Sequence, residues 1–491
     1  MKHPHLSRCV KTSYTNHLFI LSLLFTLALL LLSLAGCGKS GAMPENHGSG
    51  KTAAQTGNAS PGSQTEQENE EDYSWFSMPE ETGKLTVYSP GNAYSSLLNP
   101  AIEIFKDLYP EIEVSYTILS DEEFETRIRT EIPAGKGPDL VLLSKVTFPD
   151  IYKTMATDVF EDLNPYFGTD EEIALSDFVK PVMDVGVLNG KRYFAPMNYS
   201  VSIMMTAQSI LDEIGMTAEE LEPVDGFCEG AKRFREKYPD STLFMDTGSV
   251  NPAFGDILKM YRTFGFDLID YEAGKVNVDE ARFRQYIDLV KLYYNPDYDE
   301  TDQSMWDIPA YTAGGGLHLR RFPYDHFCGN TYQNYCNSRI FMANDGEEPV
   351  LFVPKNQQGG VTAEVELCLA IPKGAADKAA AWKLLKIMLS DDVQAGHDAN
   401  RFGASYLWSG FPVRLSSTKP EMTSEVEGLT PDGPEFDRFV ELVQSPTEAI
   451  IMPSIYNRYI HESMMPYIRG EKPWEDCWKS FMNTLELYKD E

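Results

Sequence analysis

The sequence predicts an α/β fold, and three observations lead to this prediction. Residues 84–143 alternate strand, helix, strand, helix and strand, the order that produces a parallel sheet. Hydrophobic residues make up 42% of the 491 residues, enough to fill the cores of several domains at roughly 100–200 residues each. The 74 acidic residues outnumber the 42 Lys and Arg, giving a formal charge of -32. Because a nucleic-acid binder needs a basic face, this charge argues against nucleic acid as a partner.

The folded part begins near Lys84. Residues 85–88 read as a short strand, which the turn residues Ser89, Pro90 and Gly91 close. Apolar residues then recur at helical spacing as far as Leu108, and residues 112–116 alternate apolar and polar side chains as a half-buried strand does.

A second helix and a third strand follow in the same order. Ser120 and Glu123 have the spacing of a capping box and predict a helix over about 121–131. Residues 135–138 form a turn, and the nearly continuous apolar run 139–143 is typical of a buried strand.

The remaining sequence is rich in predicted helices. A turn at 190–192 leads into a strand that reaches 196, and residues 200–206 form another short apolar run. A late strand is predicted at 364–371. Helical periodicity covers residues 209–240, 254–263, 278–294, 377–396 and 434–443.

The first 36 residues form a membrane-targeting segment. Residues 1–17 carry basic and no acidic side chains, and residues 18–36 run without any charge. This apolar stretch is long enough to be either a signal peptide or an uncleaved anchor. Residues 34–37, Leu-Ala-Gly-Cys, resemble the lipobox of bacterial lipoproteins. That resemblance implies that residues 1–36 are removed and that Cys37 is lipidated.

Residues 37–83 are predicted to be the lipidated Cys37 followed by a flexible, acidic tether, because residues 38–72 are dominated by small and polar types. Of the seven cysteines, five lie in the folded part, so at least one thiol should stay unpaired. Cys328 and Cys336 form either a local disulfide or two buried free thiols. The sequence contains neither CxxC nor HExxH, and we expect no metal and no cofactor.

Five segments in order resemble one family. They are KLTVYSP leading to FKDLYPEIEV, then GPDLVLLS, NGKRYFAPMNYS, AIPKGAADKAAAWKLLKIMLSDDVQ, and finally FPVR with IIMPSIYNRYI. Together they resemble the extracellular solute-binding proteins of ATP-binding cassette importers, in particular the carbohydrate-binding group that includes maltose-binding protein. The resemblance implies a two-lobed periplasmic-binding-protein-like fold with a ligand cleft between the lobes. The first lobe would hold 84–197 plus 362–411, and the second 198–361 plus 412–491.

Ligands of open α/β sheets bind beyond the carboxyl ends of the strands. This rule selects residues that follow predicted strands, namely Tyr88, Ser89, Asn92, Ser144, Asn198 and Tyr199. The apolar faces of a sugar ring pack on aromatic side chains, which adds Phe148, Trp306 and Trp408 from polar or Gly-rich surroundings. Arg320 and Glu364 are the charged candidates, and Arg320 in the cleft would favour an acidic sugar. Asp139 is equally well explained as a structural hydrogen-bonding group.

We therefore expect a monomeric, lipid-anchored receptor on the outer face of the bacterial cell membrane. It would bind a small solute, most readily a neutral oligosaccharide, and deliver it to membrane permease subunits without catalysing a reaction. One alternative is a cell-surface glycosidase that uses Glu364 and Glu366, which alternation places on one face of a strand. Another is a ligand sensor with the same binding fold.

Overall fold

The structure is a computed structural model that describes residues 83–144, 151–241, 243, 260, 263–264, 268–294, 325–329, 346–395, 410–418 and 433–491. Among these residues, nine strands join in one sheet whose main path runs β10-β6-β11-β3-β1-β2. The path consists of β1 (Gly83–Pro90), β2 (Ile112–Leu119), β3 (Leu140–Ser144), β6 (Ala195–Ala207), β10 (Pro349–Phe352) and β11 (Thr362–Ala370). The other three are β9 (Asp325–Gly329) and β12 (Phe411–Pro412), which pair with β6, and β13 (Glu448–Ile450), which pairs with β11.

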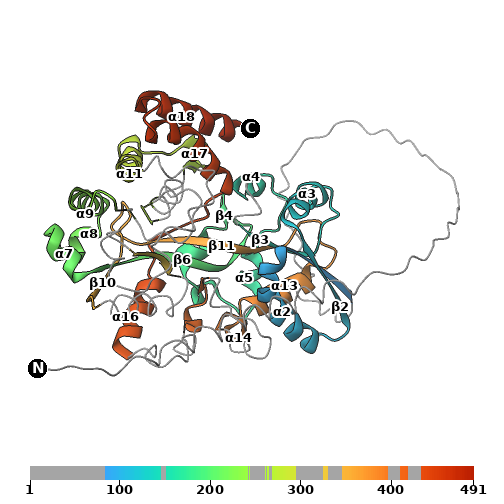
Figure 1. Ribbon diagram of the computed structural model, residues 1–491. Helices are drawn as coiled ribbons and strands as arrows, with labels where there is room; N and C mark the ends of the chain where they lie inside the picture. The colour runs from blue at the N-terminus through green and yellow to red at the C-terminus, as the bar shows by residue number, and fades with distance from the viewer. Residues whose placement is uncertain are drawn as a thin grey trace, which may run out of the picture. The chain divides into compact units, whose positions relative to one another are not determined.

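The parallel sheet predicted for the start of the folded part is confirmed. β1 pairs in parallel with both β2 and β3. The helices α2 (Gly91–Leu108) and α3 (Asp121–Glu131) connect these strands (Figure 1). The side chain of Ser120 accepts a hydrogen bond from the backbone N–H of Glu123 at 3.3 Å, so the predicted cap begins α3.

Beyond β3 the sheet becomes mixed. β11 runs antiparallel to both β3 and β6. The end of the strand predicted to reach 196 and the apolar run predicted at 200–206 belong to the single strand β6, whose first part pairs with β11 and whose second part pairs with β9 and β10. Two small hairpins lie outside this sheet, formed by β4 (Val187–Leu188) with β5 (Lys191–Arg192) and by β7 (Ile269–Asp270) with β8 (Lys275–Val276).

The segment with helical periodicity over 209–240 does not form one continuous helix. It is divided into α7 (Gln208–Ile214), α8 (Ala218–Leu221) and α9 (Val224–Lys237). Gly215 ends α7 in the left-handed conformation at φ 66°, and Pro223 precedes α9. Predicted helix 254–263 lies almost entirely outside the described residues.

The other predicted helices are present. They are α11 (Glu280–Tyr293), α13 (Lys378–Met388) with α14 (Asp391–Gln394), and α16 (Gly433–Gln444). Short helices α4 (Ile151–Ala156), α5 (Asn164–Thr169) and α6 (Lys180–Asp184) follow β3. Two long C-terminal helices that periodicity did not predict, α17 (Ser454–Ile468) and α18 (Trp474–Asp490), pack on each other, and α17 also contacts α11 (Figure 1).

Asp139, directly before β3, has the structural role that the sequence left open. One carboxylate oxygen accepts hydrogen bonds from the backbone N–H and the hydroxyl of Thr86, at 2.8 and 2.6 Å. The other accepts from the backbone N–H groups of Ala376 and Asp377, at 2.7 and 3.0 Å. These four bonds join β1, β3 and the start of α13 at one buried point.

Three of the cysteines have described side chains, and all three are buried free thiols: Cys228, Cys368 and Cys477. The prediction of at least one unpaired thiol is therefore confirmed. Burial raises the pKa of the Cys228 thiol to about 12, so it stays protonated and unreactive at neutral pH. No helix within the described ranges is long and apolar enough to cross a membrane.

Candidate functional site

The strand β6 has one polar and one apolar face, although the whole strand is buried. Successive side chains of a strand point to opposite faces, so every second residue shares a face. One face carries Asn198, Ser200, Ser202, Met204 and Thr206, whereas the other carries Tyr199, Val201, Ile203 and Met205. A strand buried on both sides is ordinarily apolar throughout, so the three successive polar positions 198, 200 and 202 are unusual. We call the face that carries them the β6 polar face.

Glu364 of β11 belongs to the same face. It pairs directly with Ser200, and residues that face each other across an antiparallel pair point to the same side of the sheet. Its side chain is almost completely buried. The register between β11 and β6 is the same before and after an irregularity near Leu367, so the alternation along β11 continues toward Glu366. Hydroxyl, amide and carboxylate groups therefore meet where β6 and β11 pair.

Asn198 occupies this irregularity in the ladder. Its side-chain Oδ1 accepts the hydrogen bond of the backbone N–H of Leu367 at 3.1 Å. Its Nδ2 is shielded from solvent and has no hydrogen-bond acceptor in the described part of the chain. Buried donors are rarely left unsatisfied, which makes this amide nitrogen a candidate donor to a water molecule or a ligand.

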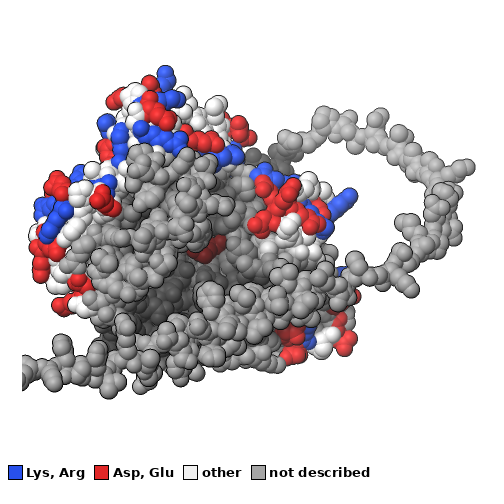
Figure 2. Space-filling model, viewed as in Figure 1, with Lys and Arg blue, Asp and Glu red and all other residues white. Residues whose placement is uncertain are grey.

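The carboxyl end of β3 adjoins the same place. Ser144, the last residue of β3, is buried and pairs with Leu367, the residue that also pairs with Asn198. The β6 polar face thus contains two of the predicted ligand residues, Asn198 and Glu364, whereas Ser144 shares the side of the sheet to which its partner Leu367 points. The surface in Figure 2 is hollowed over the position that β6 and β11 occupy in Figure 1, and acidic side-chain atoms are visible at the bottom of the hollow.

Two predicted tyrosines point elsewhere. The hydroxyl of Tyr199 donates to the carbonyl oxygen of Val443 at 2.8 Å, and its ring packs against Phe411. Burial raises the pKa of Tyr199 far above its ordinary value. The hydroxyl of Tyr88 donates to Glu131 of α3 at 3.1 Å. Both side chains are held by the body of the protein rather than by the β6 polar face.

Other predicted residues are only partly placed. Ser89 is fully buried, and its hydroxyl donates to the carbonyl of Pro90 at 3.1 Å. Asn92 lies in the first turn of α2, but its side chain is outside the described residues. Cys328 lies in β9 without a described side chain. The residues that lie outside the described ranges altogether are Cys37, Phe148, Trp306, Arg320, Cys336 and Trp408.

Sequence reasoning missed Ser200 and Ser202. The alternation of polar residues in Asn198-Tyr199-Ser200-Val201-Ser202 could have identified them, because each lies two positions from the last. Ser202 accepts a hydrogen bond from the Thr263 hydroxyl at 3.0 Å, whereas Ser200 lies between Asn198 and Glu364.

This set of groups suits hydrogen bonding to a polyhydroxylated solute. It offers a buried amide donor, hydroxyls that both donate and accept, and a carboxylate acceptor. Within the ranges that the structure describes, His, Cys, Asp and Glu side chains do not gather into a group that could hold a metal ion.

The comparison with protein families points to one family. Residues 88–241, which include the end of β1 and the whole of β3 and β6, match the bacterial extracellular solute-binding proteins. The chain resembles the bacterial extracellular solute-binding proteins. The resemblance stated from the sequence is thereby confirmed. No curated protein matches the sequence.

Solved structures of solute-binding proteins share the fold. The sugar-binding protein MalE of Xanthomonas citri matches with a TM-score of 0.59 and 15% identity, over 83% of this chain and 97% of its own. A cyclic alpha-maltosyl-1,6-maltose binding protein of Arthrobacter globiformis matches with a TM-score of 0.56 and 12% identity, over 83% and 98%. The GacH receptor of Streptomyces glaucescens, solved with and without acarbose, matches with a TM-score of 0.52 and 16% identity, over 84% and 99%. The two-lobed solute-binding-protein fold predicted from the sequence is confirmed.

Proposed function

We propose that this protein is a lipid-anchored extracellular receptor that captures an oligosaccharide and delivers it to an ATP-binding cassette permease. The observation that carries this proposal is the β6 polar face, where Asn198, Ser200 and Glu364 are buried side by side where β6 and β11 pair. The solved structures that share the fold bind MalE-type sugars, cyclic maltosyl-maltose or acarbose, and each of these ligands is rich in hydroxyl groups.

The boundary between the lobes is part of the proposal. We place 84–197 with 362–411 in the first lobe and 198–361 with 412–491 in the second. The pairing of β6 supports this division, since its residues up to Val201 pair with β11 and its later residues pair with β9 and β10. Asn198 and Ser200 then lie where the chain first passes between the lobes, so a ligand bound there contacts both and favours closure.

The anchor and the location rest on the first 37 residues. Cleavage before Cys37 and its acylation would hold the protein on the outer face of the membrane as a monomer, with residues 38–83 as a tether. For its first 35 residues, 38–72, treated as flexible coil, the root-mean-square reach is about 30–35 Å, which suffices to hold the folded part away from the bilayer. Mass spectrometry of the protein made in a bacterium tests this directly. Diacylated or triacylated Cys37 at the N-terminus is expected, and an unmodified Met1 would contradict it.

The ligand class is tested by a thermal-shift screen of the full-length chain. Neutral oligosaccharides, monosaccharides, sugar acids, peptides and amino acids are titrated separately, because a ligand that binds only the folded state raises its melting temperature. A saturable shift with a neutral oligosaccharide is expected. Shifts with peptides alone, or with no compound containing a sugar ring, would show that the assignment to carbohydrate is wrong.

The same samples distinguish the receptor from a glycosidase. We propose that Glu364 and Glu366 perform no hydrolysis, in keeping with a family and fold of binding proteins. Chromatography of the sugar after long incubation should recover it intact. Appearance of shorter sugars, abolished by Glu364→Gln, would establish the enzyme instead. A sensor would bind the sugar equally well, and is separated from a transporter by measuring uptake of that sugar in cells that lack the protein.

A further inference from the structure

A second site lies outside the β6 polar face, in a cavity of about 640 Å³. Its wall is formed by the β4–β5 hairpin and residues near it on one side, and by the β7–β8 hairpin on the other. Those predicted ligand-cleft residues whose side chains the structure describes do not line it. Cavities of about 300–1,000 Å³ are the size that holds small organic ligands.

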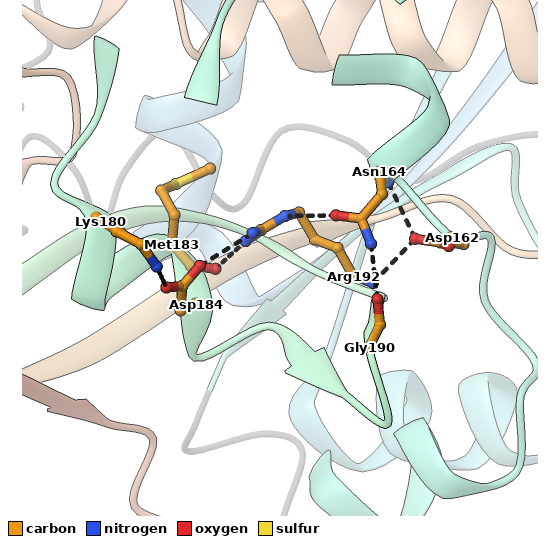
Figure 3. A network of polar contacts seen from close by, with 7 residues as sticks. All are labelled: Asp162, Asn164, Lys180, Met183, Asp184, Gly190 and Arg192. Atoms are coloured by element: carbon orange, nitrogen blue, oxygen red, sulfur yellow. Dashed lines mark hydrogen bonds and ion pairs between the residues drawn. The ribbon is translucent and has the colours of Figure 1, made fainter. Parts of the chain in front are cut away.

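Among the described residues of the wall, the arginine is Arg192, and its guanidinium already bonds to other groups of the protein. Arg192 is 5% exposed, and its guanidinium donates to Asp184 Oδ1 at 3.0 Å, to Asn164 Oδ1 at 3.3 Å and to the carbonyl oxygen of Met183 (Figure 3). Asp184 also pairs with Lys180. Burial would raise the pKa of Asp184, but its bonds to Lys180 and Arg192 outweigh burial and lower it. Asp184 and Arg192 therefore neutralise each other, and the cavity keeps three further carboxylates.

Those carboxylates are Asp270, Glu272 and Glu448. The Asp270 carboxylate accepts a hydrogen bond from the backbone N–H of Ala273 at 2.9 Å. The Glu272 carboxylate accepts one from the backbone N–H of Asn189, in the opposite hairpin, at 3.0 Å. Neither forms an ion pair with a described Lys or Arg. Both carboxylates line the cavity, and Lys275, which faces Asp270 across the β7–β8 ladder, lines the neighbouring cavity instead.

Glu448 is the most isolated of the three. It is the first residue of β13 and lies in the wall shared with a second cavity of about 470 Å³, which Lys275 and Asp279 also line. Its carboxylate forms no hydrogen bond or ion pair with any described side chain, Lys275 included. Burial raises its pKa, because water is partly excluded and no cation compensates. A cation that binds from solution would give this partly buried carboxylate the partner that the described residues do not provide.

Aromatic rings complete the wall. Tyr152 and Tyr271 stack with their ring centres 5.2 Å apart, and both line the cavity. The hydroxyl of Tyr271 lies 3.0 Å from that of Tyr456, and the hydroxyl of Tyr152 accepts the backbone N–H of Ile451 at 3.3 Å. These bonds hold the rings in place. The face of a fixed tyrosine attracts an organic cation.

We propose that this cavity binds a small organic cation that carries two or more protonated amines, held between Glu448 and the carboxylates of the β7–β8 hairpin. Among the described residues, these carboxylates do not form a group of three or more that could hold a metal ion. The positive charges along a flexible polyamine can each lie near one of the carboxylates spaced around the cavity wall. The described residues that line this cavity do not include any of those that form the β6 polar face, so separate substitutions can test the two sites.

Spermidine is the probe that tests the proposal. It is titrated into the full-length chain by isothermal calorimetry at fixed ionic strength, alongside Glu448→Gln and the matched control Glu236→Gln, an exposed carboxylate on α9. We expect saturable binding that Glu448→Gln weakens about tenfold and Glu236→Gln leaves unchanged. MgCl₂ should produce no comparable signal.

Three results would overturn the proposal. They are an absence of saturable binding, equal affinity for the wild type and Glu448→Gln, and an equal response to MgCl₂, which would indicate only charge screening. Glu448→Gln removes a charge without a partner and should fold at least as well as the wild type, so misfolding does not confuse the comparison. Binding of a sugar measured in the same samples distinguishes failure of this site from failure of the proposed function.

Discussion

Asp139 and Glu448 are carboxylates next to strands of the same sheet, yet their surroundings are opposite. Asp139 lies just before β3 and accepts four hydrogen bonds from Thr86, Ala376 and Asp377. Glu448 begins β13 beside a cavity, and its carboxylate has no partner within the described residues. The first carboxylate holds the fold together. Burial raises the pKa of the second, so the folded state disfavours its charged form.

The largest effect is expected from Asp139→Ala. The substitution leaves the hydroxyl and backbone N–H of Thr86 and two backbone N–H groups at the start of α13 without their acceptor. At about 1–3 kcal/mol for each unsatisfied buried group, partly relieved by entering water, the free energy of unfolding should fall by about 3 kcal/mol or more. Urea unfolding of the full-length chain, followed by circular dichroism, measures this. A loss below about 1 kcal/mol would show that Asp139 does not hold these segments together.

A smaller effect is expected from Arg192→Met. The substitution removes a nearly buried guanidinium that joins Asp184, Asn164 and the carbonyl of Met183 (Figure 3). Because Asp184 is partly exposed and retains Lys180, we expect a loss of about 2 kcal/mol rather than the about 3–5 kcal/mol of a fully buried pair. The control Lys180→Met removes an exposed partner of the same carboxylate and should cost less than about 0.5 kcal/mol. Equal losses for the two variants would contradict the importance of Arg192.

The smallest effect, and the one opposite in sign, is expected from Glu448→Gln. Burial raises the pKa of Glu448, so the folded protein holds this proton more tightly than the unfolded chain does. The folded state is therefore favoured below the ordinary pKa of a glutamate and penalised once the pH rises above the raised value. At pH 7, Glu448→Gln should be more stable than the wild type by up to about 1 kcal/mol, and the difference should vanish in acid.

Thermal unfolding between pH 3 and pH 8 checks this difference, with Glu236→Gln as the exposed control. A variant that is less stable than the wild type at pH 7 would mean that the Glu448 carboxylate has a stabilising partner in solution conditions. That result would remove the contrast with Asp139.

Much of the fold could be predicted because local patterns determine it. The apolar spacing before Leu108, the cap at Ser120 and the apolar run of β3 each act within a few residues, and the structure confirms all three. The direction of β11 depends on how segments distant in the sequence return to the sheet. Local periodicity carries no information about this. The break of the predicted 209–240 helix was readable in principle, from Gly215 and Pro223.

The site was harder to predict than the fold. The rule that ligands bind beyond strand ends selected Ser144 and Asn198, which the structure places on either side of Leu367. The same rule selected Tyr199 and Tyr88, which bond to Val443 and Glu131 instead. Elements far away in the sequence determine which face of a long strand packs against the core. For β6, the register with β11 shows which residues share a face.

The central claim is that the β6 polar face holds a sugar, and two neighbouring residues test it most directly. Ser200 points to the polar face, and Tyr199 to the opposite one, where its hydroxyl bonds to Val443. The neutral oligosaccharide with the largest shift in the screen is titrated by calorimetry into the full-length wild type, Ser200→Ala and Tyr199→Phe. We expect about tenfold weaker binding for Ser200→Ala and unchanged affinity for Tyr199→Phe. The free energy of unfolding of Tyr199→Phe should instead fall by about 1 kcal/mol. Unchanged affinity in Ser200→Ala, or a loss confined to Tyr199→Phe, would contradict the central claim.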